Sequence, residues 1–343
     1  IWIIPHARMR ADAKGRLSQM VDITAIGELL IDFTPAGQTE RGDMLFARIP
    51  GGAPANVLAA AAKLGNRTAF LGKVGDDAFG SFLRATLDGL GISTQGLLSD
   101  PNVHTTLAFV QLDEHGDRSF SFYRKPGADI MLDFSEVRLD LVEQAGILHF
   151  GSVSLTDEPS RTATLKTAEH AKSLGKLLSY DPNFRPPLWD SVENAKTQML
   201  RGLALADIVK VSGEELELLS GTDDLERGSA ILAEKGPSLI LVSLGAQGAF
   251  YRLGSLTGFQ PTYDVKTIDT NGAGDSFFGA VLHRLAGKSL EEIRALSRDE
   301  LEDILAYGNA AGSLTTTRKG SIPALPTEAE IEECRRTVPL LQA

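Results

Sequence analysis

Short apolar runs recur along the chain, and a polar or helix-forming segment follows each of them. The runs do not alternate strictly between apolar and polar residues, which is typical of strands covered on both faces. The predicted strands are residues 21–33 (VDITAIGELLIDF), 68–75 (TAFLGKVG), 146–155 (GILHFGSVSL), 176–183 (KLLSYDPN), 207–213 (DIVKVSG) and 238–245 (SLILVSLG). Residues 51–65 and 77–91 are predicted helices, the first with Pro54 in its first turn and Gly65 as its stop. The pattern predicts an α/β fold with a doubly wound, mostly parallel sheet.

Two segments interrupt this alternation of strand and helix. Residues 34–50 (TPAGQTERGDMLFARIP) and 105–132 (TTLAFVQLDEHGDRSFSFYRKPGADIML) are predicted β-hairpins, the second with its turn at DEHGD, residues 113–117. Strands outside the main alternation would form a separate small sheet or lid, from about residues 33–50 and 104–132.

Charge and composition narrow the classes of partner. Lys and Arg number 34 against 45 Asp and Glu, a net charge of −11, and the basic residues are scattered along the chain. This distribution argues against a nucleic-acid partner, so a phosphate ligand would be bound locally by backbone donors and a few cations. No apolar run reaches the roughly 18–20 residues of a membrane helix, and no membrane partner is expected.

The single cysteine, Cys334, excludes an internal disulfide framework and favours a cytoplasmic location. Residues 1–20 (IWIIPHARMRADAKGRLSQM) are predicted to be an N-terminal extension without function, with the functional chain starting near Met20. Their apolar part is too short for a secretory signal.

The segment DTNGAGDSFFGA, residues 269–280, carries the strongest chemical signal. The small residues Asn271 to Gly274 allow successive backbone N–H groups to converge on an anion at the start of a helix. A carboxylate beside such a turn, Asp275, suits a general base that deprotonates a hydroxyl attacking phosphorus. The alternative is a tight strand-to-helix turn in which Asp275 only complements the helix dipole. The loop matches neither GxGxxG nor GxxxxGK[ST], which weakens a dinucleotide or P-loop interpretation.

A second cluster, GGAPAN, combines the paired glycines Gly51 and Gly52 with Asn56. The glycines permit a ligand to approach the backbone, and the amide offers a donor and an acceptor to a polyol. Asp32, near the end of the first predicted strand, adds an acceptor for sugar hydroxyls. Considered without the other motifs, GGAPAN is explained equally well by a tight turn followed by an amide side chain at the start of a helix. The joint presence of these groups at parallel strand ends, where α/β sheets bind ligands, favours a site.

These segments together resemble the ribokinase-like (PfkB) carbohydrate kinase family and, within it, bacterial and plant fructokinases. The resemblance covers about residues 21–326 and rests on GELLIDF, PGGAPANVLAAAAKLG, FLGKVGDDAFG, FYRKPGAD, LSYDPNFRPPLW, DIVKVSGEELELLSG, DTNGAGDSFFGA and GSIPALP. It implies a three-layer α/β/α domain with a small β-sheet lid, at residues 21–330, followed by a C-terminal tail at 331–343. It implies phosphorylation of the 6-hydroxyl of D-fructose by ATP, giving fructose 6-phosphate and ADP.

The resemblance also implies roles for individual residues. Asp275 would be the base, and the backbone of Gly272, Ala273 and Gly274 the anion hole. The residues implied to hold or cover the sugar are Asp32, Gly51, Gly52, Asn56, Phe109, Phe122 and Arg185. The residues implied for the nucleotide are Ser212, Ser243, Gly245, Gly248 and Asn309, with Gly272 and Gly274 at its phosphates.

Two metal sites are implied as well. The family's Asn-x-x-Glu motif appears as Ser212 to Glu215, so that Glu215 would act on Mg²⁺ through water. Asp269, with carbonyls near Arg318 and Gly320, matches a region that binds a monovalent cation, which makes K⁺ a hypothesis.

Other interpretations remain open from the sequence. A kinase of the same family could act on ribose or 2-keto-3-deoxygluconate, and a catalytically silent relative could bind carbohydrate only. A dehydrogenase is disfavoured because the first strand-to-helix turn lacks GxGxxG. The exposed edges of lid strands invite pairing between subunits, so a homodimer is expected.

Overall fold

The computed structural model describes residues 10–11, 17–18, 21–112 and 118–341. The turn predicted at residues 113–117 and most of the predicted N-terminal extension lie outside the described residues. Within that extension, β1 (Arg10–Ala11) and β2 (Leu17–Ser18) pair in antiparallel fashion. Among the described residues, no helix is both long and apolar enough to cross a bilayer.

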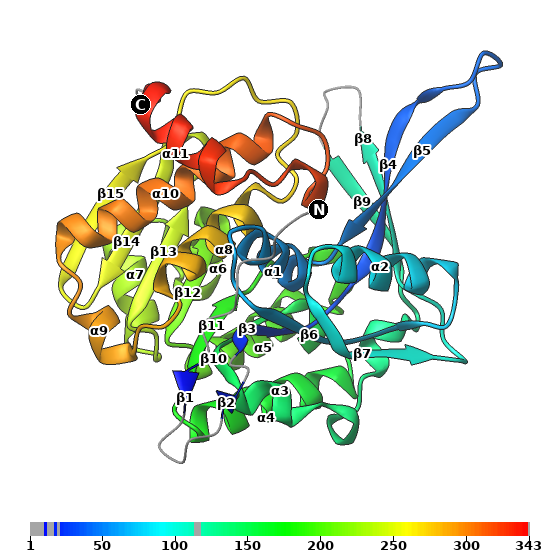
Figure 1. The fold of residues 1–343 in the computed structure, drawn as a ribbon, viewed down its shortest axis with the longest axis horizontal. Helices are drawn as coiled ribbons and strands as arrows, with labels where there is room; N and C mark the ends of the chain where they lie inside the picture. Colours follow the sequence, from blue (N-terminus) through cyan, green and yellow to red (C-terminus); the bar gives the residue numbers. More distant parts are fainter. Residues whose placement is uncertain (1–9, 12–16, 19–20, 113–117, 342–343) are drawn as a thin grey trace.

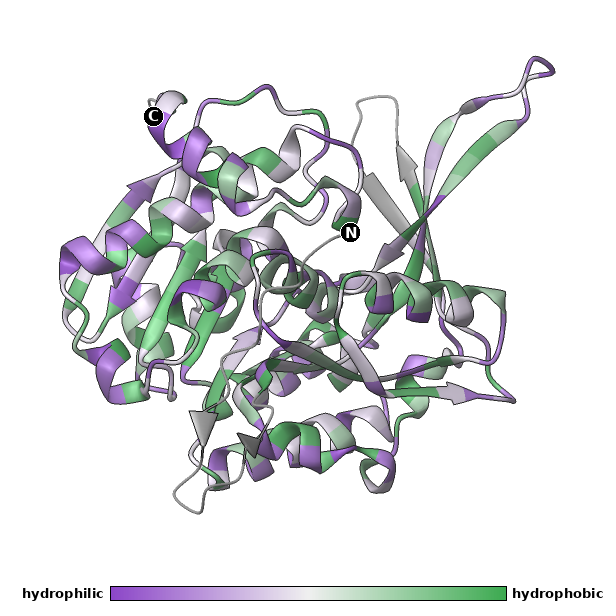
Figure 2. Ribbon diagram, viewed as in Figure 1, coloured by the Kyte–Doolittle hydropathy of each residue, from purple (hydrophilic) through white to green (hydrophobic). Residues whose placement is uncertain are grey.

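A large sheet forms the centre of the molecule, with the strand order β15-β14-β13-β12-β11-β10-β3-β6-β7. Its pairings are parallel from β7 to β13 and antiparallel at β14 and β15. The strands are β3 (Val21–Ile26), β6 (Thr68–Gly75), β7 (Ser93–Asp100), β10 (Ala145–Gly151), β11 (Leu177–Asp181), β12 (Ile208–Ser212), β13 (Leu239–Ser243), β14 (Gly248–Leu253) and β15 (Leu256–Pro261). The inner strands β12 and β13 are apolar over most of their length (Figure 2), as expected for strands buried on both faces.

Helices cover both faces of this sheet (Figure 1), which gives three layers. One face packs against α1 (Ala53–Lys63), α2 (Ala78–Gly89), α8 (Ala273–Leu285), α9 (Leu290–Arg294) and α10 (Arg298–Thr316). The other packs against α3 (Leu139–Glu143), α4 (Ser160–Ser173), α5 (Val192–Leu205), α6 (Gly213–Ser220) and α7 (Leu225–Ala233). The predicted α/β fold with a mostly parallel central sheet is confirmed.

A separate small sheet has the order β5-β4-β8-β9. It consists of β4 (Leu30–Gln38), β5 (Met44–Gly51), β8 (Leu107–Leu112) and β9 (Arg118–Tyr123). Both predicted hairpins are present, and the parallel pairing of β4 with β8 joins them. The β4–β5 hairpin projects away from the body of the molecule (Figure 1).

The single strand predicted at residues 21–33 is wrong. The structure divides it into β3 of the large sheet and β4 of the small sheet, with the break at residues 27–29. Leu30 already pairs with Gly51 of β5, so the chain changes sheets within three residues. An apolar run buried in both sheets gives no sign of this change.

The boundary predicted at residue 331 falls inside a helix, α11 (Glu328–Thr337). Ile331 and Cys334 lie one turn apart and are buried in a cluster with Tyr307 and Ala310 of α10. This part of the predicted tail is therefore packed onto the domain.

Candidate active site

The N-terminus of α8 forms the turn predicted to hold an anion. Gly272 adopts φ 74° at the N-cap, and a Cβ there would lie 2.5 Å from the Cβ of Ser321, so only glycine suits this position. The N–H groups of the first turn have no acceptor within the helix, and the helix dipole adds partial positive charge. The arrangement can bind an anion.

Asp275 lies in the first turn of α8, opposite Asn56 of α1. The amide Nδ2 of Asn56 donates a hydrogen bond of 2.8 Å to Oδ2 of Asp275. The two helices pack closely because Gly279 has no side chain, and a Cβ at Gly279 would lie 2.6 Å from the Cβ of Ala60. The packing of α1 on α8 thus brings together residues that are 219 positions apart.

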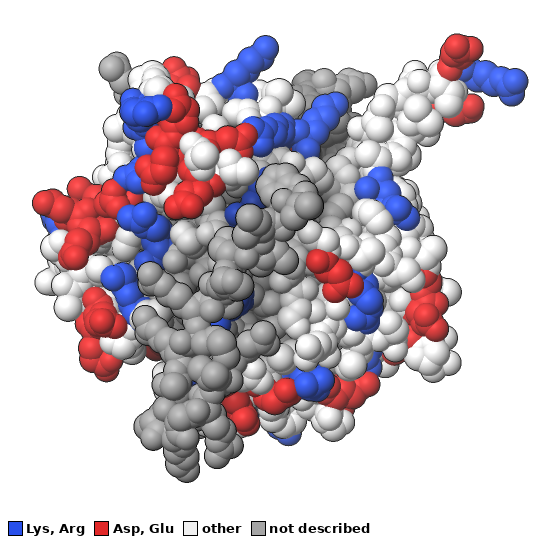
Figure 3. Space-filling model, in the orientation of Figure 1, with Lys and Arg blue, Asp and Glu red and all other residues white. Residues whose placement is uncertain are grey.

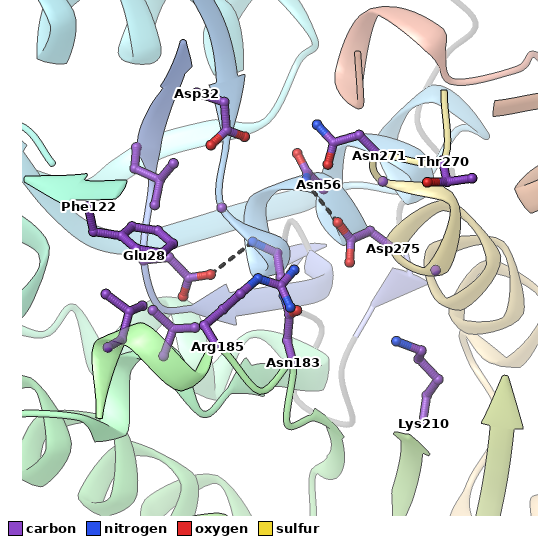
Figure 4. Close-up of a pocket in the computed structure, with 17 residues that line it drawn as sticks. Glu28, Asp32, Asn56, Phe122, Asn183, Arg185, Lys210, Thr270, Asn271 and Asp275 are labelled. Carbon is purple, nitrogen blue, oxygen red and sulfur yellow. Dashed lines mark hydrogen bonds between the residues drawn. The ribbon is translucent and has the colours of Figure 1, made fainter. Parts of the chain in front are cut away.

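A cavity of 340 Å³, here called the acidic cavity, lies between the small sheet and the ends of the central strands. Figure 4 shows Asp32, Arg185 and Asp275 extending into it from different elements. Its lining is Glu28, Leu30, Asp32, Gly52, Ala53, Asn56, Phe122, Val153, Asn183, Arg185, Leu188, Lys210, Thr270, Asn271, Gly272, Gly274 and Asp275. The structure therefore gathers Asp32, Gly52, Asn56, Phe122, Arg185 and Asp275, all predicted from sequence, in one cavity.

Burial controls the charge state of the acids in this cavity. It raises the pKa of Asp32 to about 7, and the positive charge of Arg185 opposes the shift. Burial also raises the pKa of Asp275, helped by repulsion from Asp181 and opposed by Lys210. Carboxyl groups with raised pKa values in a cavity are candidates for proton transfer near neutral pH.

A turn after β11 places Arg185 in the cavity. Asn183 has φ 47°, and its N–H donates to Oδ1 of Asp181 at 3.1 Å. The next N–H, of Phe184, donates to Oε1 of Glu215 at 2.6 Å. These bonds hold the sequence DPNFR against α6 and thereby orient the guanidinium of Arg185.

Lys210 is a buried cation near the anion-binding turn. Its Nζ donates to Oδ2 of Asp181 at 2.7 Å, and it lies 3.2 Å from the point that a Cβ on Gly274 would occupy. Burial is the largest single effect on Lys210 and lowers its pKa, but the combined attraction to Asp181, Glu215 and Asp275 outweighs it and raises the pKa above its ordinary value. Lys210 is therefore charged where an anion would bind.

A second cavity of 470 Å³, here called the glycine-lined cavity, lies on the other side of the turn. Among its lining residues are Ser243, Gly245, Gly248 and Asn309, each predicted for the nucleotide, and Ala273, predicted for the anion hole. It shares Thr270 and Gly274 with the acidic cavity. Its volume is within the range of small-molecule sites.

Residues 20–328 match the model of the pfkB family carbohydrate kinases. The chain belongs to this family. It is 45% identical over 315 residues to a probable fructokinase-4 of Arabidopsis thaliana, covering 90% of this chain and 95% of that protein. It is also 45% identical over 314 residues to fructokinase-1 of Oryza sativa subsp. japonica, covering 90% and 96%.

Solved structures of pfkB-like kinases superpose on the whole domain. Fructokinase from Xylella fastidiosa with bound ATP gives a TM-score of 0.86 at 34% identity and covers 92% of this chain and 98% of that one. Fructokinase from Vibrio cholerae O395, with fructose, ADP and calcium, gives 0.82 at 36% identity and covers 92% and 99%. The similarity confirms the predicted ribokinase-like fold.

Two residues predicted at the sugar of this pfkB kinase lie elsewhere. Phe109 is on the outer face of the small sheet, where its ring stacks on Phe33 at 4.9 Å, whereas Phe122 faces the acidic cavity. Strand alternation separates them, because Phe109 pairs with Ser121. Gly51 does not line the cavity, and a Cβ there would overlap Oδ2 of Asp32. The missing side chain of Gly51 therefore leaves room for the side chain of Asp32 rather than for a ligand.

Ser212 and Glu215 form the capping box of α6 and line neither cavity. The hydroxyl of Ser212 accepts from the N–H of Glu215 at 3.1 Å, and Oε2 of Glu215 accepts from the N–H of Ser212 at 2.8 Å. Repulsion between Glu215 and Asp181 contributes to a raised pKa of Glu215, after burial as the main cause. Glu215 thus belongs to the acidic neighbourhood of Lys210, and its action on a divalent ion remains a prediction.

Asn309 is fixed by the backbone at one end of β15. Its Nδ2 donates to the carbonyl oxygens of Gln260 at 2.9 Å and Pro261 at 3.1 Å. It lines the glycine-lined cavity, but these donors already serve the protein.

Asp269 links two loops at the predicted monovalent site. Its Oδ1 accepts from the N–H of Asn271 at 2.8 Å and its Oδ2 from the N–H of Gly320 at 2.9 Å. Arg318 directs its guanidinium to Glu330. In the described part of the chain, no group of three or more His, Cys, Asp or Glu side chains is arranged to hold a metal ion. A monovalent cation there would depend on carbonyl oxygens, and its binding remains a prediction.

Four polar residues that also line the acidic cavity were not predicted from the sequence: Glu28, Asn183, Lys210 and Thr270. Lys210 and Glu28 could have been identified from the sequence, because each is a charged residue within an apolar run. Asn183 and Thr270 lie in turns, where polar residues are common without a ligand.

The raised pKa of Asp32 predicts that stability falls with rising pH. The folded protein keeps a proton on Asp32 up to about pH 7, whereas the unfolded chain releases it near its ordinary value of 3.8. Between these values the folded state binds more protons, so the free energy of unfolding decreases as pH rises. In urea unfolding at pH 5.5 and pH 8, Asp32 should contribute stability at pH 5.5 that is lost at pH 8. Asp32→Asn should reduce the difference, whereas Asp223→Asn, at an exposed aspartate, should preserve it; equal differences in both variants would contradict the assignment.

Proposed function

We propose that this kinase transfers the γ-phosphoryl group of ATP to the 6-hydroxyl of D-fructose. The observation that carries the proposal is the junction of the two cavities at Thr270 and Gly274, with Asp275 on the side of the acidic cavity. A sugar in the acidic cavity and a nucleotide in the glycine-lined cavity would meet at the anion-binding turn. The fructokinase relatives, one solved with fructose and ADP, support fructose as the acceptor.

In the proposed reaction, Asp275 accepts the proton of the 6-hydroxyl as that oxygen attacks the γ-phosphorus. The bond between the γ-phosphorus and the oxygen bridging to the β-phosphate breaks, and ADP leaves with the electron pair. The N–H groups of Gly272 to Gly274 and the ammonium of Lys210 stabilise the negative charge on the transferring group. Asp32, Asn56 and Arg185 would hold the remaining hydroxyls.

Mg²⁺ would reach this site with the nucleotide. Magnesium usually keeps several waters and binds one or two carboxylates together with substrate phosphates. The carboxylates of Asp181 and Glu215 near the anion-binding turn suit such water-mediated contacts. When bound, the ion would neutralise phosphate charge. We also propose K⁺ as the ion near Asp269.

The small sheet would act as a lid over the sugar. Asp32 and Phe122 reach the acidic cavity from β4 and β9 of this sheet. A lid that excludes water prevents water from competing as the phosphoryl acceptor.

The decisive test is a substrate panel. The purified protein would be incubated with ATP and Mg²⁺ and with fructose, glucose, ribose or 2-keto-3-deoxygluconate, while ADP release is followed. Fructose should give the highest kcat/KM, and phosphate should be found on the 6-oxygen. Turnover of another sugar without turnover of fructose would reject the substrate, and no turnover of any sugar would reject the activity.

The outer face of the small sheet supports a homodimer. Met44, Phe46 and Tyr123, which lie on this face, are each 41–65% exposed although they are apolar or aromatic. Figure 3 shows charges at the hairpin tip but largely uncharged surface along its arm. Such a patch is typical of a protein interface. Sedimentation should show a dimer, and the variant Phe46→Glu should convert it to a monomer. The control Leu174→Glu, at an exposed leucine at the C-cap of α4, should leave the dimer intact. A wild-type monomer at micromolar concentration would contradict the proposal.

We also propose a cytoplasmic location for this kinase. ATP is available in the cytoplasm, and Cys334 is a free buried thiol.

A further inference from the structure

Glu28 is a buried acid whose position none of the roles above explains. It lies between β3 and β4 and is only 2% exposed, and it lines the acidic cavity. Its Oε1 accepts a hydrogen bond of 2.9 Å from the N–H of Ala53 in the first turn of α1. Gly52, the N-cap of α1, has no side chain to cap the helix, so Glu28 caps it from another element.

Capping accounts for only one of the two carboxyl oxygens. Oε2 of Glu28 is buried and has no hydrogen-bond partner in the part of the chain that the structure describes. A buried acceptor without a partner is costly. Because Glu28 lines the acidic cavity, a ligand bound there would be placed to supply that partner. Among the described residues that line the acidic cavity, Glu28 alone has a buried side-chain oxygen or nitrogen without a hydrogen-bond partner.

The nearby cation does not supply that partner. Arg124 directs Nε to Asp129 at 2.7 Å, Nη1 to the hydroxyl of Thr156 at 2.7 Å and Nη2 to the carbonyl of Val153 at 3.0 Å. Asp129 is itself buried and adds repulsion. Burial is the main reason that the pKa of Glu28 is raised to about 7. Arg124 thus leaves Oε2 for another donor, and a hydroxyl of a ligand is one.

Helix α1 connects Glu28 with the reacting end of the cavity. Asp275 is bonded to the side chain of Asn56, and Glu28 to the N–H of Ala53, three residues earlier. Three residues rise about 4.5 Å along a helix, which is comparable to the width of a sugar ring. In Figure 4, Glu28 and Asp275 lie on either side of Asn56.

We propose that Oε2 of Glu28 accepts a hydrogen bond from a hydroxyl of the bound sugar, at the end remote from the hydroxyl that is phosphorylated. This inference rests on the proposed function for the identity of the sugar. Glu28 would therefore select sugars that carry a hydroxyl at that end, and its contact would contribute to binding more than to the chemical step.

The variant Glu28→Gln tests the contact, because its carbonyl oxygen can still cap Ala53 while its amide replaces the acceptor Oε2. At pH 8, where the carboxyl group of Glu28 is mostly ionised, KM for fructose should rise about 10- to 100-fold, the effect of losing a hydrogen bond to a charged group, while kcat and KM for ATP change less than about 3-fold. The control Thr68→Val removes another unpartnered buried oxygen, outside the cavity, and should leave KM unchanged.

Deoxy sugars distinguish a direct contact from a structural role. In the wild type, each of 1-, 3- and 4-deoxyfructose should have a lower kcat/KM than fructose. In Glu28→Gln, one of the three deoxy sugars should have the same kcat/KM as fructose. The hydroxyl that this sugar lacks is the one that Glu28 contacts in the wild type. Equal further losses for all three, or an unchanged KM for fructose, would overturn the proposal.

Two arrangements keep the test independent of folding and of the proposed substrate. Should the variant not fold, a crystal structure of the wild type with sugar decides the matter: Oε2 within about 3 Å of a hydroxyl supports the proposal, and no such contact overturns it. Should the wild type phosphorylate a sugar other than fructose, the proposed substrate fails, and Glu28 is tested with that sugar and its deoxy analogues.

Discussion

Asp275→Asn lowers kcat for fructose phosphorylation by about 100- to 10,000-fold, the usual contribution of a general base. Asparagine cannot accept the proton of the hydroxyl, but its side-chain oxygen can still accept the hydrogen bond from Asn56. The site should therefore keep its shape, and ATP should bind with nearly unchanged affinity. Steady-state kinetics and calorimetric titration with ATP measure the two quantities.

Asp207→Asn is the matched control for this variant. Asp207 is another partly buried aspartate with a raised pKa, caused mainly by burial, but its Oδ2 accepts from the N–H of Leu178, where β11 begins. Its replacement should change kcat less than about 3-fold. A kcat of Asp275→Asn within tenfold of the wild type would remove Asp275 from the role of base.

Lys210→Met should lower both stability and activity. It leaves Asp181 buried and unpaired, which typically costs about 3–5 kcal/mol in the free energy of unfolding. It also removes the cation beside the anion-binding turn, so kcat should fall at least about 100-fold. Because Lys210 lowers the pKa of Asp275, its loss should move the acid limb of the kcat profile to higher pH.

The double variant Lys210→Met/Asp181→Asn separates these effects. Replacing the carboxylate by an amide removes the unpaired charge, so urea unfolding should show most of the lost stability regained. The kcat should stay low, since the cation is still missing; the single variant Asp181→Asn measures how much of the loss comes from replacing a carboxylate proposed for Mg²⁺. If kcat recovers together with stability, Lys210 acts only through its structural pairing with Asp181.

The sequence was sufficient to predict the layers of the fold because the apolar runs of β6, β10, β12 and β13 are buried on both faces. It could not predict that the run from Val21 to Phe33 serves two sheets, because burial in either sheet selects the same apolar residues. The packed helix at the C-terminus was missed for a related reason. Only Ile331 and Cys334 of α11 are buried, too few for a periodic signal.

The candidate site was predictable where a residue type is unusual for its position. Asp275 beside a glycine-rich turn and Asn56 after paired glycines both line the acidic cavity. The face of a lid residue was harder to predict, because Phe109 and Phe122 have the same character but point to opposite faces. The partner of Glu28 depends on α1, whose position relative to β3 is a tertiary property.

The close fit between Gly51 and Asp32 constrains how this site can diverge over evolution. A side chain at position 51 would lie 2.3 Å from Oδ2 of Asp32, so the Asp32 side chain would have to turn away from its present position. A larger residue 51 would therefore displace the carboxylate without any change at residue 32. The sugar contact proposed for Asp32 is for this reason sensitive to the size of residue 51.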